Sequence, residues 1–473
     1  MSISAGKDTF IVCRNSQGTE VRATQLRLTR YVVVFEVYNP YSILQLSEVL
    51  TDFKIIINDR MVYSGRAVVS NLVNTGIILI CEATLENEWL DVNIFASLYQ
   101  KDKLQNEFTE FLKEWQKTKH ISAEFKAVIA DLQTFLMDMQ RWLEQVELGI
   151  QSEATHDRLQ VERDAIQELQ APAFSAVGSL FGRYEETAQG VPEELQPIHR
   201  AYVKNQIHPL ILCSPFVYRV FRKPLGYAGD YEMVNMMLRD PFEGSSLFAK
   251  ILNVHFLKAP PCEAHRNRIK YLTESLDVET RRVSQTGRNL RVFNLGCGPA
   301  REIQNFLAKD DLCEKADLTL LDFNDETLQY TDSILKALKE KHHRKTSIRM
   351  VKKSVNQILK ESMRPVENPE DKNFDMVYCA GLFDYLSDRI CKKLMDYFYD
   401  ILAPGGLLIA TNVDKSNPIR HGMEAFLEWH LVYRDRQQLL ELRPSAAPEG
   451  SYQVKADVTG VNIFIEVRKP DVL

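Results

Sequence analysis

The feature that most restricts the fold lies after residue 290, where short apolar segments alternate with segments of helical character. Strands alternating with helices predict a parallel, doubly wound α/β sheet. Five segments read as strands, and they are LRVFNL, ADLTLLDF, SIRMVKK, FDMVYCAG and GGLLIATNV. REIQNFLA and ETLQYTDSILKALKE, between them, read as helices. The tail SYQVKADVTGVNIFIEVRKP predicts an antiparallel hairpin at the sheet edge, with its turn at Gly460.

The first of these strands ends in a glycine-rich turn, VFNLGCGPARE, at 292–302. In an open α/β sheet, ligands bind beyond the carboxyl ends of the strands. Gly296 and Gly298 would let the main chain lie against a ligand, because glycine has no Cβ. Asp322 lies at the tip of the second strand, where an acidic side chain can accept both hydroxyls of a ribose. The turn and the acid together indicate a cofactor of the adenosine type.

The spacing of the glycines narrows the choice of cofactor. The pattern is Asn-x-Gly-x-Gly and not the GxGxxG of dinucleotide sites, and Pro299 stands where pyrophosphate needs a free helix N-terminus. With Asp322, with KSVN after the third strand and with LAPGGLLI before the fifth, the turn resembles that of class I S-adenosylmethionine-dependent methyltransferases. NAD binding, and an α/β domain whose glycines serve only packing, remain the alternatives.

The resemblance implies S-adenosylmethionine as the cofactor and assigns residues to it. Asn294, Gly296, Cys297 and Gly298 would line its methionine part, unless the cysteine is only a small apolar filler. Asp322 would hold the ribose, and Phe323, Ser354 and Val355 would lie near the adenine. Ala380, Gly381 and Leu382 would border the sulfonium. The eight cysteines form no CxxC pair, so neither a metal site nor a disulfide framework is expected.

Five stretches are more particular than the general fold. They are FRKPLGYAGDYEMVNMM (221–237), AHRNRIKYL (264–272), GLFDYLSDR (381–389), MEAFLEWHLVYR (423–434) and DVTGVNIFIEV (457–467). Together they resemble the bacterial methyltransferases of 3-hydroxypalmitate methyl ester (extracellular factor) biosynthesis, over about residues 215–470. This resemblance implies a helical lid before the methyltransferase core, and carboxyl O-methylation of a small acid such as a 3-hydroxy fatty acid.

A carboxylate acceptor is already ionised at pH 7, so it needs no general base, but its oxygens need a cationic partner. Arg222, Arg266 and Arg268 are candidates for that partner, and we prefer Arg266. Tyr227, Asp230 and Tyr231, in the turn GYAGDY, are expected to close over the cofactor. The alternative for Asp230 is that it only caps the helix that follows.

Other side chains would matter for a different acceptor or for an acyl chain. A hydroxyl or amine acceptor would need a base, and the candidates are His265, His255, His421 and His430. Phe426, Trp429 and Tyr433 are expected close together on one helix, either below an acyl pocket or in the core. Cys379 lacks the preceding proline of base-methylating enzymes, and CAGLFDYL lacks the Asn/Asp-Pro-Pro-aromatic signature. Nucleic-acid acceptors are therefore excluded.

Residues 10–85 read as short β-strands of a small barrel or sandwich, and this part resembles a degenerate PilZ domain, the cyclic di-GMP receptor. Arg22, Arg27 and Arg30 do not have the Arg-x-x-x-Arg spacing, and Val73 replaces the serine of the second motif in NLVNTG. The paired arginines clamp the nucleotide, so we expect no tight binding of cyclic di-GMP.

A long amphipathic pattern runs from Phe108 to Val146 and includes Trp115, Phe135 and Trp142. It predicts helices that either form a homodimer seam or are covered within the chain by helices at 155–170 and 195–215. The expected segments are thus a PilZ-like barrel at 1–88, a helical dimerisation region at 89–190, a helical lid at 191–285 and the catalytic sheet at 286–473.

Composition excludes several classes of protein. The chain has 473 residues and a net charge of −6, which argues against a general nucleic-acid binder. The N-terminus lacks the pattern of a signal peptide and no apolar run is long enough to span a membrane, so a cytoplasmic protein is expected. Three functions remain open: methylation of a small acid, methylation of another small molecule or a protein, and non-catalytic cofactor binding in signalling or interaction.

Overall fold

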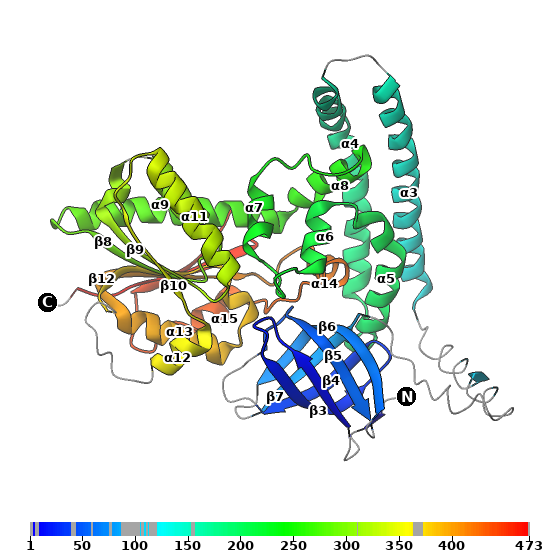
Figure 1. The fold of residues 1–473 in the computed structure, drawn as a ribbon, viewed down its shortest axis with the longest axis horizontal. Helices are drawn as coiled ribbons and strands as arrows, with labels where there is room; N and C mark the ends of the chain where they lie inside the picture. The colour runs from blue at the N-terminus through cyan, green and yellow to red at the C-terminus, as the bar shows by residue number, and fades with distance from the viewer. Residues whose placement is uncertain are drawn as a thin grey trace. The chain divides into compact units, whose positions relative to one another are not determined.

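The computed structural model describes residues 3–4, 9–38, 44–57, 60–74, 78–86, 105, 108–109, 112, 121–152, 157–309, 311–362 and 372–471. The chain divides into two units, both discontinuous in sequence, whose elements are labelled in Figure 1. Unit 1 comprises residues 1–228, 240–256 and 419–430, and unit 2 comprises residues 229–239, 257–418 and 431–473. The four expected segments are continuous in sequence, and their bounds stay a prediction.

Unit 1 begins with a closed antiparallel barrel. Its strands are β2 (Thr9–Arg14), β3 (Glu20–Leu28), β4 (Val32–Tyr38), β5 (Val49–Ile57), β6 (Arg60–Asn74) and β7 (Ile78–Leu85), with β1 (Ile3–Ser4) added beside β3. The barrel closes because β3 pairs with both β2 and β4. Alternate residues point inward, and Ile11, Phe35 and Phe53 are fully buried. The β prediction for this part is confirmed in its barrel form.

The elements described in unit 1 after the barrel are helices. They are α3 (Ala123–Ser152), α4 (Arg158–Gln189), η1 (Glu193–Leu195), α5 (Gln196–Ile211), α6 (Pro215–Arg222), α8 (Leu247–Leu257, with Leu257 itself in unit 2) and α14 (Arg420–Phe426). Within the described ranges, no helix is both long enough and apolar enough to cross a membrane.

Helix α3 is covered by α4 and α5. Its buried face carries Phe125, Leu132, Leu136 and Leu143, and the Phe125 ring packs against Tyr184 of α4 and His199 of α5. This confirms the intrachain alternative for that face. Other residues of the amphipathic pattern lie outside this buried face. Phe135 and Met139 are half-buried, and Trp142 is 55 % exposed. Trp115 lies outside the described residues, and the homodimer stays a prediction.

The helix expected to carry Phe426, Trp429 and Tyr433 together is shorter than predicted. Helix α14 ends at Phe426, and Glu428 takes a left-handed conformation with φ 48°. Lys204 fixes the Glu428 carboxylate at 2.5 Å, which holds this bend. The three aromatic residues therefore share no helical face. All three are buried, and the Phe426 ring packs against the rings of Phe181 and Tyr184.

Unit 2 contains a seven-stranded sheet in the order β10-β9-β8-β11-β12-β14-β13. The strands are β8 (Leu290–Leu295), β9 (Ala316–Asp322), β10 (Ser347–Lys352), β11 (Phe374–Cys379), β12 (Leu402–Val413), β13 (Tyr452–Ala456) and β14 (Asn462–Arg468). The first five in this order are parallel, and β14 is antiparallel to both β12 and β13. The predicted strands and the edge hairpin are confirmed.

Helices cover both faces of this sheet (Figure 1). The helices described in unit 2 are α7 (Tyr231–Leu238), α9 (Pro260–Ser284), α10 (Arg301–Lys309), η2 (Asp311–Lys315), α11 (Asp325–Lys341), α12 (Val355–Glu361), η4 (Phe383–Tyr385), α13 (Asp388–Ile401) and α15 (Arg436–Glu441). Leu276 of α9 and Phe306 of α10 pack on one face, while Leu394 and Phe398 of α13 pack on the other. The doubly wound prediction is confirmed, and the strand order reverses between β8 and β11, where such sheets bind ligands.

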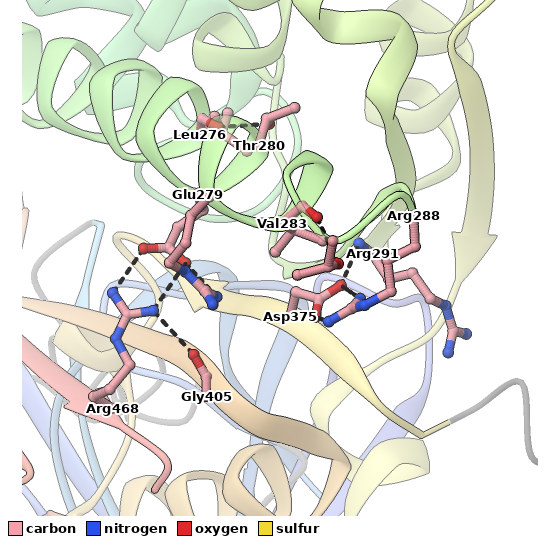
Figure 2. Close-up of polar contacts among 11 residues, drawn as sticks. Leu276, Glu279, Thr280, Val283, Arg288, Arg291, Asp375, Gly405 and Arg468 are labelled. Atoms are coloured by element: carbon pink, nitrogen blue, oxygen red, sulfur yellow. Dashed lines mark hydrogen bonds and ion pairs between the residues drawn. The ribbon is translucent and has the colours of Figure 1, made fainter. Parts of the chain in front are cut away.

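Charged contacts fasten α9 and the start of the sheet (Figure 2). Arg468 of β14 donates to Glu279 of α9 at 2.6 Å and to the Gly405 carbonyl at 3.1 Å. Arg288 donates to both oxygens of buried Asp375, at 2.6 Å each, at the amino end of β11. These ion pairs therefore brace the amino ends of the central strands and leave the carboxyl ends for other contacts.

Candidate functional site

The glycine turn after β8 is held against the neighbouring strand. The amides of Gly296 and Cys297 both donate to the Leu321 carbonyl of β9, at 2.8 and 2.9 Å. Gly296 and Gly298 have φ values of 72° and 51°, in the left-handed region that favours glycine. A Cβ added at Gly298 would meet no atom within 4 Å. The turn thus presents bare main chain to open space.

Asp322, at the carboxyl end of β9, lies against this turn. Its Oδ2 accepts from the Gly298 amide at 3.1 Å, and its Oδ1 accepts from the Asn324 amide at 3.0 Å. Burial raises the pKa of this carboxyl, and backbone N–H donors, including those of Asn324 and Gly298, oppose the rise. The two sequence features that indicated an adenosine-type cofactor are therefore in direct contact.

Asn294, at the end of β8, has an unused hydrogen-bond acceptor. Its Nδ2 donates to Glu302 Oε1 at 3.3 Å, and the Tyr378 hydroxyl donates to the same oxygen at 2.8 Å. The Asn294 Oδ1 is buried and has no hydrogen-bond partner among the described residues. A buried acceptor of this kind normally has a donor, so the position suits a cationic or amide group of a ligand.

Cys297 and Cys379 are buried, and burial raises the pKa of each thiol well above its usual range. Neither thiol is thus a nucleophile at neutral pH, since the thiolate is the reactive form. Burial fits the interpretation of both residues as small apolar fillers, and a contact of Cys297 with the cofactor stays a prediction.

The loop after β11 lies beside the glycine turn. The Gly381 amide donates to the Thr411 hydroxyl of β12 at 3.0 Å. A Cβ added at Gly296 would be 3.7 Å from the Leu382 side chain. Residues 380–382, predicted to border the sulfonium, are therefore adjacent to the turn predicted to hold the methionine part.

The predicted adenine-side residues follow β9 and β10. The Lys353 amide donates to the Asp322 carbonyl at 3.0 Å, which brings the end of β10 to Asp322. Ser354 caps α12 in a reciprocal capping box with Gln357, and Val355 packs partly against the core. Phe323 is half-buried. Ser354 thus has a structural task of its own, and its contact with a cofactor stays a prediction.

The turn at 229–231 contacts elements that follow two strands of the sheet. The Tyr231 ring stacks on Tyr330 of α11, and its hydroxyl donates to Glu326 at 2.9 Å. A Cβ at Gly229 would come within 2.9 Å of the Tyr385 hydroxyl, in η4. Helix α11 follows β9 and η4 follows β11, and β8 lies between these strands.

Within this segment Asp230 caps α7, because its side chain accepts from the Met233 amide at 2.8 Å. The capping alternative is confirmed, and a contact of Asp230 with the cofactor stays a prediction. Tyr227 belongs to unit 1, where the neighbouring Gly226 carbonyl accepts from Val49 of the barrel at 2.7 Å. A contact of Tyr227 with the cofactor stays a prediction.

The preferred arginine, Arg266, is engaged in structural contacts. It donates to the Met237 carbonyl at 2.9 Å, to the Leu257 carbonyl at 3.0 Å and to Glu263 at 2.9 Å. These bonds give Arg266 a bracing role, and its contact with a substrate stays a prediction. Arg268 is the arginine whose guanidinium reaches the loop after β11. Arg222 belongs to unit 1 and lies 3.7 Å from Glu86.

The four histidines considered as bases are all shifted toward the neutral form. Burial lowers the pKa of each, to about 4 for His255 and about 3 for His430. Only His265 lies in unit 2, where its ring is 3.0 Å from Arg268.

Sequence reasoning missed the polar residues that organise the loop after β11. Asp384 accepts from the Val413 amide at 2.6 Å, and buried Arg434 donates to the Phe383 and Leu386 carbonyls at 2.9 and 2.6 Å. Both residues lie in the family-like stretches 381–389 and 423–434, so the resemblance was the available signal. Among the described residues, no three His, Cys, Asp or Glu side chains are grouped to hold a metal ion.

No protein-family model matches the chain, and no curated protein matches it. Solved structures do resemble it. A possible exported protein from Bordetella parapertussis is 17 % identical, covers 63 % of this chain and 97 % of its own, and has a TM-score of 0.39.

Two methyltransferases are also similar. Magnesium protoporphyrin IX methyltransferase (ChlM) from Synechocystis PCC 6803 with bound SAH is 8 % identical over 50 % of this chain and 92 % of its own, with TM-score 0.32. The N-methyltransferase NodS from Bradyrhizobium japonicum WM9, in complex with S-adenosyl-l-homocysteine, is 13 % identical over 51 % and 98 %, with TM-score 0.30. Scores this low leave the assignment of function to the chemistry of the site.

Proposed function

We propose that unit 2 binds S-adenosylmethionine at the glycine turn and methylates the carboxylate of a small acid, with 3-hydroxy fatty acids as the substrate class. One observation carries this proposal. The Asp322 carboxylate accepts from the Gly298 amide, and Gly298 faces open space at the carboxyl end of the sheet. A ribose-binding acid and a bare main-chain cradle thus meet at one place.

The residues present fit the cofactor. Each oxygen of Asp322 accepts one backbone N–H, and a carboxylate oxygen can accept a second bond, so both ribose hydroxyls find acceptors. The unpaired Asn294 Oδ1 would accept from the amino group of the methionine part. Phe323, Ser354 and Val355 would lie near the adenine, and residues 380–382 near the sulfonium.

When bound, S-adenosylmethionine would supply an electrophilic methyl group. The acceptor carboxylate forms the new oxygen–methyl bond as the sulfur–methyl bond breaks, which yields a methyl ester and S-adenosylhomocysteine. No proton has to move, because the acid is ionised at pH 7. The chain therefore has to orient the acceptor and exclude water. The turn at 229–231 would help to exclude water, and its contacts with α11 and η4 support this role.

Unit 1 would contribute protein contacts and homodimer assembly in this proposal. We propose that its barrel is a degenerate PilZ-like module without tight cyclic di-GMP binding, and that the helical middle forms a homodimer. Arg22 is exposed in the barrel, and its guanidinium lies 3.0 Å from Glu20. This ion pair supports the view that Arg22 belongs to no preformed nucleotide clamp.

The test has a binding arm and a turnover arm. Calorimetry compares S-adenosylhomocysteine with NAD, and the proposal predicts binding of the first alone. Mass spectrometry then follows S-adenosylhomocysteine release with 3-hydroxy fatty acids, with aliphatic amines and with a cell extract. Release with acids supports the proposal. Release with amines alone would show that the methyl acceptor is an amine and not a carboxylate. Binding without any release would leave a cofactor-binding signalling module.

A further inference from the structure

Arg268 brings a buried positive charge to the loop after β11. It lies on α9 and is 7 % exposed. A Cβ added at Gly381 would lie 2.9 Å from its Nη2 and 3.1 Å from its Nη1. Glycine at position 381 thus makes room for the guanidinium, which lies against the loop that borders the glycine turn.

The Arg268 guanidinium has more N–H donors than the described residues around it have acceptors. It carries five N–H groups, and among the described residues one hydrogen-bonding side chain meets it, that of His265, with both ring nitrogens 3.0 Å from Nη2. A neutral imidazole has a single acceptor nitrogen, so His265 satisfies at most one of the N–H groups. No carboxylate of the described residues lies within ion-pair distance of Arg268.

Two acidic groups act on Arg268 electrostatically without pairing with it, and they are Asp384 and Glu302. Asp384 accepts from the Val413 amide, and Glu302 accepts from the Tyr378 hydroxyl. Burial raises the pKa of both carboxyls, and the positive charge of Arg268 opposes that rise.

Other arginines of unit 2 differ in this respect. Arg288 pairs with Asp375, Arg434 with Asp388 and Arg468 with Glu279. Those pairs brace the fold. A buried arginine without a carboxylate is costly unless an anion completes it.

We propose that Arg268 is the carboxylate-binding residue of the site. Its planar fork matches a carboxylate in a bidentate arrangement, with Gly381 providing room and His265 orienting Nη2. The proposal rests on the function proposed above and names its acceptor contact. The same chemistry is offered by two carboxylates, that of the acceptor acid and that of the cofactor's methionine part, and the experiment separates them.

The variants are Arg268→Gln, which removes the charge, and Arg268→Lys, which keeps the charge without the fork. Lys270→Gln is the matched control, because Lys270 lies on the same helix with its side chain 76 % exposed. Thermal unfolding and circular dichroism check each fold. Calorimetry measures S-adenosylhomocysteine, 5′-methylthioadenosine (which lacks the carboxylate), 3-hydroxydecanoate and its methyl ester. The last two are titrated with and without saturating S-adenosylhomocysteine.

If Arg268 holds the acceptor, the wild type prefers the acid to the ester by about tenfold or more, and Arg268→Gln loses that preference. If Arg268 holds the cofactor, Arg268→Gln lowers the affinity for S-adenosylhomocysteine by about tenfold or more. The affinity for 5′-methylthioadenosine then stays unchanged. Arg268→Lys should fall between, and the control should match the wild type. An Arg268→Gln variant that keeps both affinities overturns the proposal. A wild type that binds no S-adenosylhomocysteine refutes the proposed function instead, and the acid–ester comparison without it still tests Arg268.

Discussion

Asp322 is the residue whose replacement tests the cofactor site most sharply. In the proposed complex its carboxylate accepts from the ribose hydroxyls while it also accepts from the Gly298 and Asn324 amides. Hydrogen bonds to a charged group contribute about 1.5–3 kcal/mol. Loss of the ribose contacts should therefore weaken S-adenosylhomocysteine binding by roughly 10- to 150-fold.

Two replacements separate binding from folding. Asp322→Asn keeps one carbonyl oxygen for a backbone amide but loses the charge and half of the acceptors. Asp322→Ala also leaves the Gly298 and Asn324 amides without their acceptor, which costs a further ~1–3 kcal/mol of stability. We therefore expect both variants to bind weakly and only Asp322→Ala to melt clearly lower.

Calorimetry with S-adenosylhomocysteine measures the affinity, and differential scanning fluorimetry measures the stability. Asp325→Asn is the control, because Asp325 is an exposed acid in the first turn of α11 that pairs with Lys352. The control should bind like the wild type. An unchanged affinity in Asp322→Asn would refute the assignment of Asp322 to the ribose.

Four further predictions concern the rest of the molecule. Titration of cyclic di-GMP into the protein should show no tight binding, and a micromolar dissociation constant would contradict the degenerate-barrel reading. Light scattering should give a dimer that Trp142→Glu dissociates, since Trp142 is 55 % exposed on α3, whereas a wild-type monomer at micromolar concentration would refute the homodimer. Arg288→Ala should destabilise the fold by about 2 kcal/mol in urea titrations, because buried Asp375 loses a half-exposed partner, and a change near zero would contradict that ion pair's bracing role. Burial between Phe174 and Phe181 lowers the pKa of His255 to about 4, so the unfolded state binds a proton before the folded state does as the pH falls from 7 to 5. Over that range the wild type should lose about 1–2 kcal/mol more stability than His255→Phe. Equal losses would contradict the lowered pKa.

The sheet and its glycine turn were predictable because local sequence controls them. Strand β8 occupies LRVFNL as predicted, and β9 ends at Asp322. Parallel strands place their carboxyl ends at one edge, so the turn after β8 and the acid after β9 had to be neighbours. The amide of Gly298 meeting the Asp322 carboxylate follows from that topology.

The choice between Arg266 and Arg268 was not predictable from composition, because it depends on how α9 is rotated against the sheet. Two positions along a helix point about 200° apart. The buried positions Leu272 and Leu276 continue, at a spacing of four, from Arg268 and not from Arg266. That helical phase puts Arg268 on the buried side of α9, and a substrate contact of either arginine stays a prediction.

The amphipathic pattern on α3 was predictable only in part. Phe125 and Leu132 of the predicted pattern are buried, whereas Leu136 and Leu143 also pack and Trp142 is exposed. Contacts between distant parts of the sequence were equally invisible. Lys204 and Glu428 are 224 residues apart, and their ion pair helps to place residues 419–430 in unit 1. Such pairs depend on tertiary packing, which no local pattern encodes.

The most direct test of the central claim is the fate of the transferred methyl group. The protein is incubated with S-adenosylmethionine bearing a trideuterated methyl group and with 3-hydroxydecanoate, and the products are followed by mass spectrometry before and after mild alkali. The account predicts a trideuteromethyl ester, which alkali hydrolyses to labelled methanol and the free acid. The Arg268→Gln and Asp322→Asn variants should produce this ester far more slowly than the wild type. A labelled product that resists alkali, or no labelled product from any acid, would contradict carboxyl methylation.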